Sequence, residues 1–374
     1  MKHAAWIIGV VAGVTGCSGA VVGGDAGAYA GSRNGGSAGS AGGNFPMAGG
    51  SGGDPSPSGG SGGEPGPVGG GSGGGGTTEY PSCTLDIDAW IAFDWERASI
   101  GIEEGGPFYN RDIYLVRPDG SSLTRLTSDE SIEKEPYFSP TGDRLSFTSN
   151  SSGSTQIYIM DLATRAVTKL TDRAEGADQS SISPDGKLVA FHSGASIFTV
   201  EPDGSNETLI ATGLDDLNAY FNPKFIGNDQ LVFDRNNEIN AINLDKSNFR
   251  NIVANTAAMI IAPTVSPKND EIAYASQCGD VALSIWTASV ATGAPPCSGR
   301  RISPAHDPLT STRPSWGPAN KVAYERVDLA THIGRITIDD RAPGAVPCSL
   351  TDGSEDSRNP NWSPTGFKLA PDPH

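Results

Sequence analysis

The sequence predicts an all-β fold, a six-bladed β-propeller of four-stranded antiparallel blades, and two repeating turns carry this prediction. A Ser-Pro-x-Gly turn, or a degenerate form of it, recurs six times along the chain. Its prolines lie roughly 40 to 50 residues apart, the period of a four-stranded propeller blade: Pro140, Pro184, Pro223, Pro267, Pro318 and Pro364. A second series places Pro-Asp-Gly or a related turn between a β-rich run and a Leu-Thr run. Because proline presets φ and glycine takes the positive φ of a hairpin, both turns have a mechanical reason to recur.

The repeating unit is clearest at residues 136–171. Tyr137-Phe138 and residues 145–148, 157–160 and 167–171 are predicted strands, separated by polar turns. One such sheet is marginal in water by itself, so the copies must pack against one another. The continuous apolar run at residues 157–160 fits a strand that is buried on both faces.

The two chain ends are predicted to share a blade. Residues 90–95, 113–116 and 123–127 match the second, third and fourth strands of the unit, but no first strand precedes them. An isolated copy of the first strand and its turn stands at residues 360–366. We expect this C-terminal strand to complete the N-terminal blade and close the ring, which removes an exposed sheet edge.

The repeat motifs resemble those of a known family. ISPDG at residues 182–186, IYIMD at 157–161 and TKLT at 168–171 together resemble the repeat of the TolB-like β-propellers. The resemblance covers about residues 90–369. It implies the propeller fold and contacts with other envelope proteins, such as a peptidoglycan-associated lipoprotein. That family carries a separate N-terminal α/β domain, and here a Gly/Ser-rich segment takes its place, which leaves the specific role open.

The N-terminal region is predicted to export and tether the domain. Residues 1–16 combine Lys2 with an apolar run too short to span a bilayer, as in a signal peptide. Val14-Thr15-Gly16-Cys17 resembles a bacterial lipobox, which makes Cys17 the lipid-attachment site; an ordinary secretory peptide with an incidental cysteine is the alternative. Residues 17–78 are rich in Gly, Ser, Ala and Pro and predict a disordered tether, so the propeller occupies residues 79–374.

Four further cysteines bound the redox chemistry. Cys83, Cys278, Cys297 and Cys348 allow two disulfides with three connectivities in an exported chain. Cys278 with Cys297 and Cys83 with Cys348 are attractive pairs, but the strand predicted at residues 284–290 separates the first two. Isolated thiols are the alternative. The chain has no CxxC, so neither a redox nor a zinc motif is supported.

The charge distribution suggests a ligand class. The net charge of −17 disfavours nucleic acid and anionic lipid surfaces. Acidic residues gather on the connections that lead from one blade to the innermost strand of the next, so one mouth of the channel is predicted to be negative. The candidate ligand-binding residues are Asp129, Glu133, Glu135, Asp178, Asp215, Asp216, Asp352 and Asp356. They would receive a basic peptide segment, an amino sugar or a calcium ion; the alternative is that they only keep the protein soluble.

These observations predict a binding module rather than an enzyme. His192, His306 and His332 show no nucleophile pattern, and no catalytic residue is identified. We expect a monomeric, lipid-anchored interaction module of the cell envelope, on the outer membrane and facing the periplasm or the surface, that binds an envelope protein or a cationic ligand. It would touch the membrane through its lipid alone. A calcium-dependent hydrolase of the lactonase or esterase kind and a purely structural surface protein are the alternatives.

Overall fold

The structure, a computed structural model, describes residues 80–370 except 97–109, 214–219, 255–258, 281, 292, 294, 305–306 and 342–344. The predicted signal peptide, Cys17, the tether, Asp215, Asp216 and His306 therefore lie outside the described residues. No helix of the described residues is long and apolar enough to cross a membrane.

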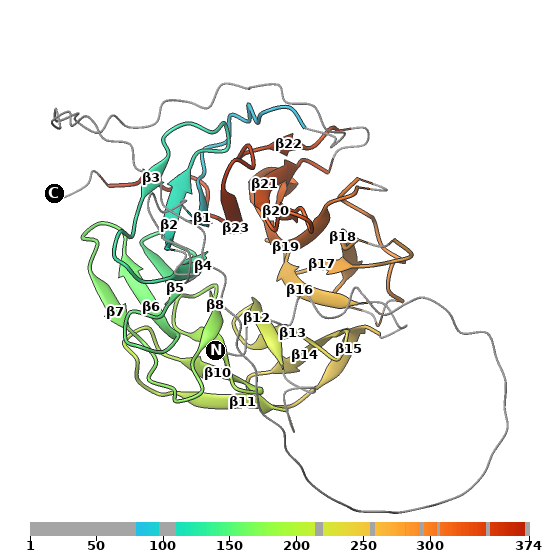
Figure 1. Cartoon of the computed structure of the whole chain (residues 1–374). Coiled ribbons are helices and arrows are strands. Elements are labelled where there is room, and N and C mark those ends of the chain that lie inside the picture. Colours follow the sequence, from blue (N-terminus) through green and yellow to red (C-terminus); the bar gives the residue numbers. More distant parts are fainter. Residues whose placement is uncertain are drawn as a thin grey trace, which may run out of the picture. The chain divides into compact units, whose positions relative to one another are not determined.

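Six antiparallel sheets surround a central channel, which confirms the predicted six-bladed propeller (Figure 1). Blade 1 contains β23 (Asp356–Trp362), β1 (Ile91–Glu96), β2 (Arg111–Val116) and β3 (Thr124–Arg125). Blade 2 contains β4 (Glu133–Phe138), β5 (Arg144–Ser149), β6 (Gln156–Asp161) and β7 (Val167–Lys169). Blade 3 contains β8 (Asp178–Ile182), β9 (Val189–Ser193), β10 (Ser196–Val200) and β11 (Thr208–Thr212).

The remaining blades follow in chain order around the ring. Blade 4 contains β12 (Phe221–Ile226), β13 (Gln230–Arg235), β14 (Glu238–Asn243) and β15 (Arg250–Val253). Blade 5 contains β16 (Ile260–Val265), β17 (Glu271–Ser276) and β18 (Ser284–Ser289). Blade 6 contains β19 (Thr310–Trp316), a 3₁₀ turn at Pro318–Asn320, β20 (Val322–Val327), β21 (Gly334–Asp339) and β22 (Cys348–Ser349).

Blade 5 is the irregular one, since only three of its strands form a regular sheet. The outer position is held by residues 300–302 through two backbone hydrogen bonds. The Thr287 amide donates to the Arg300 carbonyl at 2.9 Å, and the Ile302 amide donates to the Ile285 carbonyl at 2.8 Å. The outer strand is therefore present in its contacts but too short to continue as a ladder.

The serine of the repeated turn fixes its geometry. In blade 2 the Ser139 hydroxyl donates to Asp143 at 2.7 Å and accepts the Arg144 amide at 3.0 Å. In blade 3 the Ser183 hydroxyl donates to Asp185 at 2.7 Å. Each turn thus satisfies its own polar groups and can recur unchanged from blade to blade.

The core lies between neighbouring blades. Ile113 packs in a cluster with Phe138 and Leu145 of blade 2, whereas the next residue, Tyr114, packs in a cluster with Ile336 of blade 6. Successive side chains of one strand point to opposite faces, so both faces of blade 1 are covered. This explains the continuous apolar runs of the sequence.

The ring closes as the sequence predicts, because the C-terminal strand β23 pairs with β1. Ile91 lies opposite Trp362 and Glu96 lies opposite Asp356 in the antiparallel register. The indole of Trp362 also packs against Gly317, where a β-carbon would overlap the ring. The first and last strands of the propeller therefore share one sheet, which leaves no open edge at the innermost position.

Two disulfides reinforce the outer parts of the ring. Cys83 bonds to Cys348, with Cα atoms 4.9 Å apart, and joins the segment before β1 to β22 in blade 6. Cys278 bonds to Cys297 within blade 5. Their Cα atoms lie 5.6 Å apart despite the intervening β18, so the separation that the strand suggested does not arise.

Candidate functional site

The candidate site is the central channel, which is lined by the innermost strand of every blade. It encloses a cavity of about 60 Å³. That is room for a few water molecules or one small side-chain group, but not for a folded partner. Its lining includes one equivalent residue from each blade: Glu135, Gln179, Asn222, Ala262, Arg313 and Asn359.

These six equivalent residues, the bulge residues, share an unusual backbone conformation. Their φ angles are positive and lie between 48° and 58°. The pairing register of the innermost strand shifts at each of them, which marks a β-bulge. A non-glycine residue with positive φ costs on the order of 1–3 kcal/mol. A bulge of this kind turns the backbone amide out of its ladder, so it needs another acceptor.

Five of the six bulge amides find that acceptor on the preceding blade. The pairs are Glu135 N to Asp94 Oδ1 at 3.0 Å, Gln179 N to Glu135 Oε2 at 3.0 Å, Asn222 N to Gln179 Oε1 at 2.8 Å, Ala262 N to Asp234 Oδ1 at 3.0 Å and Asn359 N to Glu325 Oε2 at 3.1 Å. We call the five accepting residues the acceptor ring. Each of its members holds the innermost strand of the next blade in place.

Blade 5 carries alanine where the other blades carry the acceptor. Acceptors stand either at the bulge position or directly after the aromatic residue of the second strand, as Asp234 follows Phe233. In blade 5 these positions are Ala262 and Ala275. Among the described side chains, none accepts the amide of Arg313 in blade 6.

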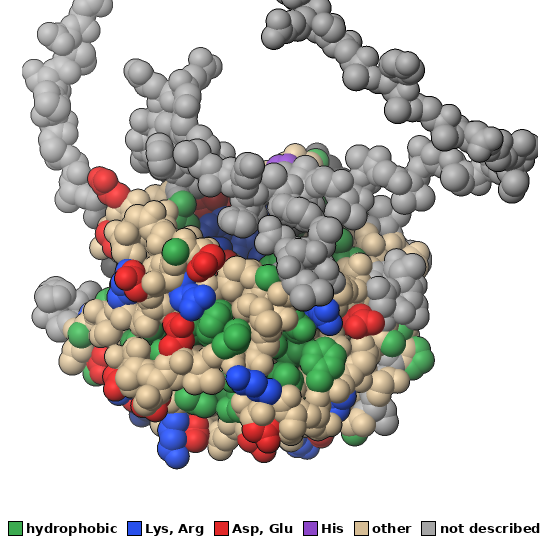
Figure 2. Space-filling view, turned by 90° about the horizontal axis from the view of Figure 1, so that it is seen from below, with side chains coloured by type: hydrophobic (Ala, Val, Ile, Leu, Met, Phe, Trp, Pro, Cys, Tyr) green, Lys and Arg blue, Asp and Glu red, His purple; other side chains and the backbone are tan. Residues whose placement is uncertain are grey.

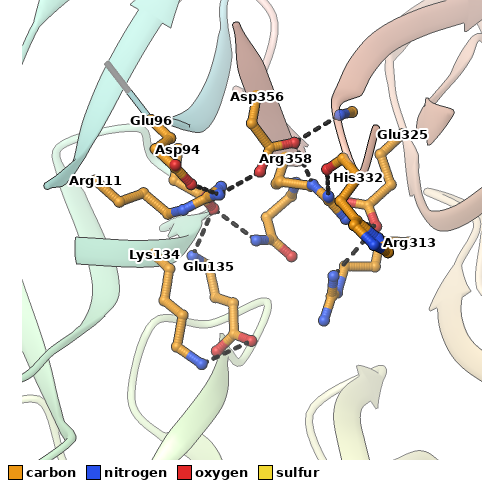
Figure 3. Close-up of polar contacts among 12 residues, drawn as sticks. Asp94, Glu96, Arg111, Lys134, Glu135, Arg313, Glu325, His332, Asp356 and Arg358 are labelled. Atoms are coloured by element: carbon orange, nitrogen blue, oxygen red, sulfur yellow. Dashed lines mark hydrogen bonds and ion pairs between the residues drawn. The ribbon is translucent and has the colours of Figure 1, made fainter. Parts of the chain in front are cut away.

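Arginines neutralise the acids at the closing blade (Figure 3). Arg111 on β2 donates to Asp94 at 2.6 Å and to Glu96 at 2.8 Å, and it also pairs with Asp356 on β23. Burial lowers the pKa of Arg111, but Asp94 and Asp356 more than offset this and raise it. Burial raises the pKa of Asp356, yet Arg358 at 2.6 Å and Arg111 hold it below its ordinary value. Three carboxylates thus share two guanidinium groups at this point of the ring.

Two further cations lie at the mouth beside ring members. Arg313 pairs with Glu325 at 3.1 Å, and Lys134 lies 3.6 Å from a Glu135 oxygen. The charge of Glu135 holds the pKa of Lys134 above its ordinary value. The inner part of the mouth is thus a network of alternating charges rather than a negative surface.

Lys224 differs from these cations. It lies on β12, and its ammonium is 3.5 Å from the Ser180 carbonyl oxygen and 5.1 Å from the ring centre of Tyr137. Within the described part of the chain, no carboxylate oxygen lies within ion-pair distance of it. Burial lowers its pKa to about 8, although Glu135 and Asp234 act in the opposite direction.

His192 packs at a strand end, and it also holds a carboxylate. Its Nδ1 lies 2.7 Å from Asp178 Oδ1 and its Nε2 lies 2.7 Å from the Gly194 carbonyl oxygen. Burial lowers the pKa of His192, but the hydrogen bond and charge of Asp178 more than compensate and raise it. Asp178 is therefore occupied by an internal partner.

The acids proposed from the sequence fall into two groups. Asp129 and Asp352 are exposed on the connections before β4 and β23, and each accepts the amide of the serine two residues later. Glu135, Asp178 and Asp356 are held by internal partners. Glu133 is buried, with 1% of its surface exposed, and its carboxylate accepts a hydrogen bond from the Ser149 hydroxyl at 2.7 Å. Burial raises the pKa of Glu133 to about 7.

Sequence reasoning missed the acceptor ring and its cations. Asp94, Asp234 and Glu325 each follow the aromatic residue of a second strand, and Arg313 and Asn359 each precede a proline. These two patterns recur at a fixed place in the unit and were available as signals. The described residues contain no group of three or more His, Cys, Asp or Glu placed to hold a metal ion, so no observation favours the calcium-dependent hydrolase.

Comparison with known proteins agrees with this fold. The family described as the TolB beta propeller domain matches residues 97–242. A TolB homolog of Chlorobium luteolum is 32% identical over 104 residues, which are 26% of this chain and 24% of that protein. A Tol-Pal system protein TolB of Cereibacter sphaeroides is 39% identical over 74 residues, 19% of this chain and 17% of that protein. The matches thus span less than a quarter of these relatives.

Solved structures resemble the chain more widely at lower identity. TolB from Acinetobacter baumannii superposes with a TM-score of 0.61 and 17% identity over 75% of this chain and 68% of that one. Hydrazine synthase of Kuenenia stuttgartiensis gives 0.58 and 13% identity over 77% of this chain and 48% of that one. Such likeness shows the fold alone, since one scaffold hosts unrelated activities. The family match at residues 97–242 and these structural likenesses agree in indicating a TolB-like β-propeller fold.

Proposed function

We propose that this chain is a protein-interaction module of the cell envelope, whose partner docks over the channel mouth at the N-terminal ends of the innermost strands. The observation that carries the proposal is the distribution of acids at this mouth. The inner acids are neutralised by Arg111, Arg313 and Arg358, whereas Asp129 and Asp352 stand exposed around them. A rigid ring with an unpaired acidic rim suits a basic segment of another protein.

The family supports the envelope setting. Relatives of this chain are named as components of the Tol-Pal system. Figure 2 shows another side of the propeller, where acidic and basic side chains are interspersed rather than gathered by sign. That side offers no comparable charge signal for a partner.

Site-specific photo-crosslinking tests the docking surface. A photoreactive residue at position 129 or 352 of the full chain should yield a discrete adduct with an envelope protein in living cells. The same residue at Asp203 or Asp245, which lie at the opposite end of the blades and form the same Asp-x-Ser turn, should not. Adducts at 203 and 245 but not at 129 and 352 would contradict the proposed surface.

Membrane attachment is a separate part of the proposal. A lipid on Cys17 would hold the protein on the outer membrane as a monomer, and the segment up to residue 78 would give the propeller its reach. Metabolic labelling with a radioactive fatty acid should mark the chain, and Cys17→Ala should remove the label. Equal labelling of the variant would show that the lipid is elsewhere.

A further inference from the structure

The acceptor ring is interrupted in blade 5, where Ala262 offers no side-chain oxygen to the amide of the next blade. Glu135 and Gln179 show that a side chain at the bulge position reaches the amide of the next blade. Ala262 occupies the same position in blade 5 with φ 54°, within a few degrees of Gln179 at 58°. Both residues thus take the same positive φ at the bulge, and Ala262 lacks the longer side chain whose oxygen Gln179 offers to the next blade.

The interruption is flanked by cations. Lys224 on β12 and Arg313 on β19 stand on the two sides of β16, and both line the same cavity as Ala262. Arg313 lies near enough to act on Lys224, since its charge contributes to the lowered pKa of that lysine. Lys224 donates to one carbonyl oxygen, at 3.5 Å, and an ammonium has three protons to donate. The Arg313 guanidinium pairs with Glu325 at 3.1 Å, so the groups left without an acidic partner beside Ala262 are the backbone amide of Arg313 and the ammonium of Lys224, among the described residues.

We propose that the channel between β12 and β19 binds a carboxylate. One oxygen accepts the Arg313 amide, as Glu325 accepts the Asn359 amide in the next blade, and the other pairs with the Lys224 ammonium. All five acceptors that the protein itself uses are carboxylates or a carboxamide, so a planar group of this size fits the position. Hydrogen bonds to an ionised acceptor are about twice as strong as neutral ones, which favours an acid over an amide.

This inference deepens the proposed function but can be tested without it. In the docking proposal, the carboxylate belongs to an acidic side chain or to the C-terminus of the partner segment that lies over the mouth. A free small carboxylate has the same chemistry. The site itself depends only on Ala262, Lys224 and Arg313.

Acetate titration of the ¹⁵N-arginine-labelled full chain tests the site directly. The Arg313 amide, identified as the resonance lost in Arg313→Lys, should shift downfield and saturate with sodium acetate, but not with sodium chloride at equal ionic strength. An Arg313 amide that responds equally to both salts would overturn the proposal.

Filling the position from within provides the sharpest variant. Ala262→Gln copies Gln179 and should supply the missing acceptor, so acetate affinity should fall by at least about tenfold. Ala319→Gln is the matched control, because Ala319 is exposed in the turn between β19 and β20 and also has positive φ, 51°. Affinity that is unchanged in Ala262→Gln would contradict the site.

The ammonium is tested separately. Lys224→Met keeps most of the apolar stem and removes the charge, so acetate should bind at least about tenfold more weakly. Lys187→Met is the control, since this lysine is 80% exposed in a turn outside the channel. Equal weakening in both variants would mean that only net charge matters.

Two capped tripeptides separate the possible sources of the carboxylate. Acetyl-Gly-Asp-Gly-amide presents a side chain, and acetyl-Gly-Gly-Gly presents a C-terminus. Stronger shifts with the first assign the site to acidic side chains, and with the second to chain ends. Shifts with acetate alone would assign the site to free small acids, and the docking of a partner would then rest on the crosslinking result. No shift with acetate or with either peptide would refute the carboxylate site.

Discussion

The side-chain oxygen of Gln179 accepts the backbone amide of Asn222 at 2.8 Å, so blade 3 fixes the innermost strand of blade 4. The same relation ties four further pairs of neighbouring blades. It satisfies amides that the β-bulges remove from the sheets, and it makes the wall of the channel a single connected structure. Blade 5 is the exception, and supplying its missing acceptor should raise the free energy of unfolding.

Ala262→Gln should stabilise the protein. The new side chain supplies an acceptor for the Arg313 amide at a backbone position that already accommodates glutamine in blade 3. A net hydrogen bond contributes about 0.5–1.5 kcal/mol to the free energy of unfolding. Urea unfolding should show this gain for Ala262→Gln and no gain for Ala319→Gln. A loss of stability at position 262 would mean that the alanine is required by packing.

Arg111→Met should destabilise the ring closure. The variant leaves Asp94, with 0% side-chain exposure, and Asp356 without their shared cation. Removing one partner of a buried ion pair costs about 3–5 kcal/mol. Arg144→Met is the control, because its pair with Asp143 is open to solvent and contributes about 0–1 kcal/mol. Similar unfolding midpoints for the two variants would show that the closing network adds little.

Glu133→Gln should change how stability depends on pH. Burial first, and Asp129 and Asp112 in addition, raise the pKa of Glu133 to about 7 from 4.5. The folded protein therefore holds a proton that the unfolded chain has released between these values. The contribution of this group to the free energy of unfolding is fully present below about pH 4.5. It is lost as the pH rises to about 7, by on the order of 3 kcal/mol.

Unfolding of Glu133→Gln at a series of pH values checks this. The variant should match the wild type near pH 4.5 and exceed its stability at pH 8, because the amide does not ionise and so leaves no buried charge at high pH. Glu130→Gln, an exposed neighbour, should follow the wild type throughout. A variant that is less stable than the wild type at pH 8 would show that the ionised carboxylate is needed.

The two disulfides should differ in their contribution. Cys83–Cys348 closes a loop with a sequence separation of 265, and Cys278–Cys297 closes one of 19. Chain entropy assigns about 5 kcal/mol to a long loop and about 3 kcal/mol to a short one. The double variant Cys83→Ser with Cys348→Ser should therefore unfold at lower urea than Cys278→Ser with Cys297→Ser. The reverse order would mean that local strain or packing outweighs loop entropy.

The sequence predicted the architecture well because its signals are local and repeated. Turn motifs set the blade count, and the unpaired copy at residues 360–366 identified the closing strand. The weak outer strand of blade 5 escaped notice, since residues 300–302 form only two ladder bonds in a short run.

The channel was harder to predict than the fold. The place of Asp129 and Asp178 on the connections between blades indicated that both lie toward one mouth of the channel. It could not show that Asp178 forms a hydrogen bond with His192 on β9. Contacts in the closing blade join residues far apart in sequence, as Asp94 on β1 and Asn359 on β23 illustrate with a 2.6 Å hydrogen bond. Burial likewise separates Glu133 from its exposed neighbour Asp129, and burial depends on the assembled ring.

Charge reversal at the acidic rim tests the central claim, that a partner docks over this mouth, most directly. The bait is the full chain, and the measured quantity is the yield of the envelope protein that crosslinking identifies, captured without crosslinking at low and at high salt. One double variant carries Asp129→Lys and Asp352→Lys, and the matched double variant carries Asp203→Lys and Asp245→Lys. All four residues form the same Asp-x-Ser turn, so the local cost is equal. We expect the first pair, like high salt, to abolish capture, and the second pair to retain it. Full capture by the first pair would contradict the docking surface.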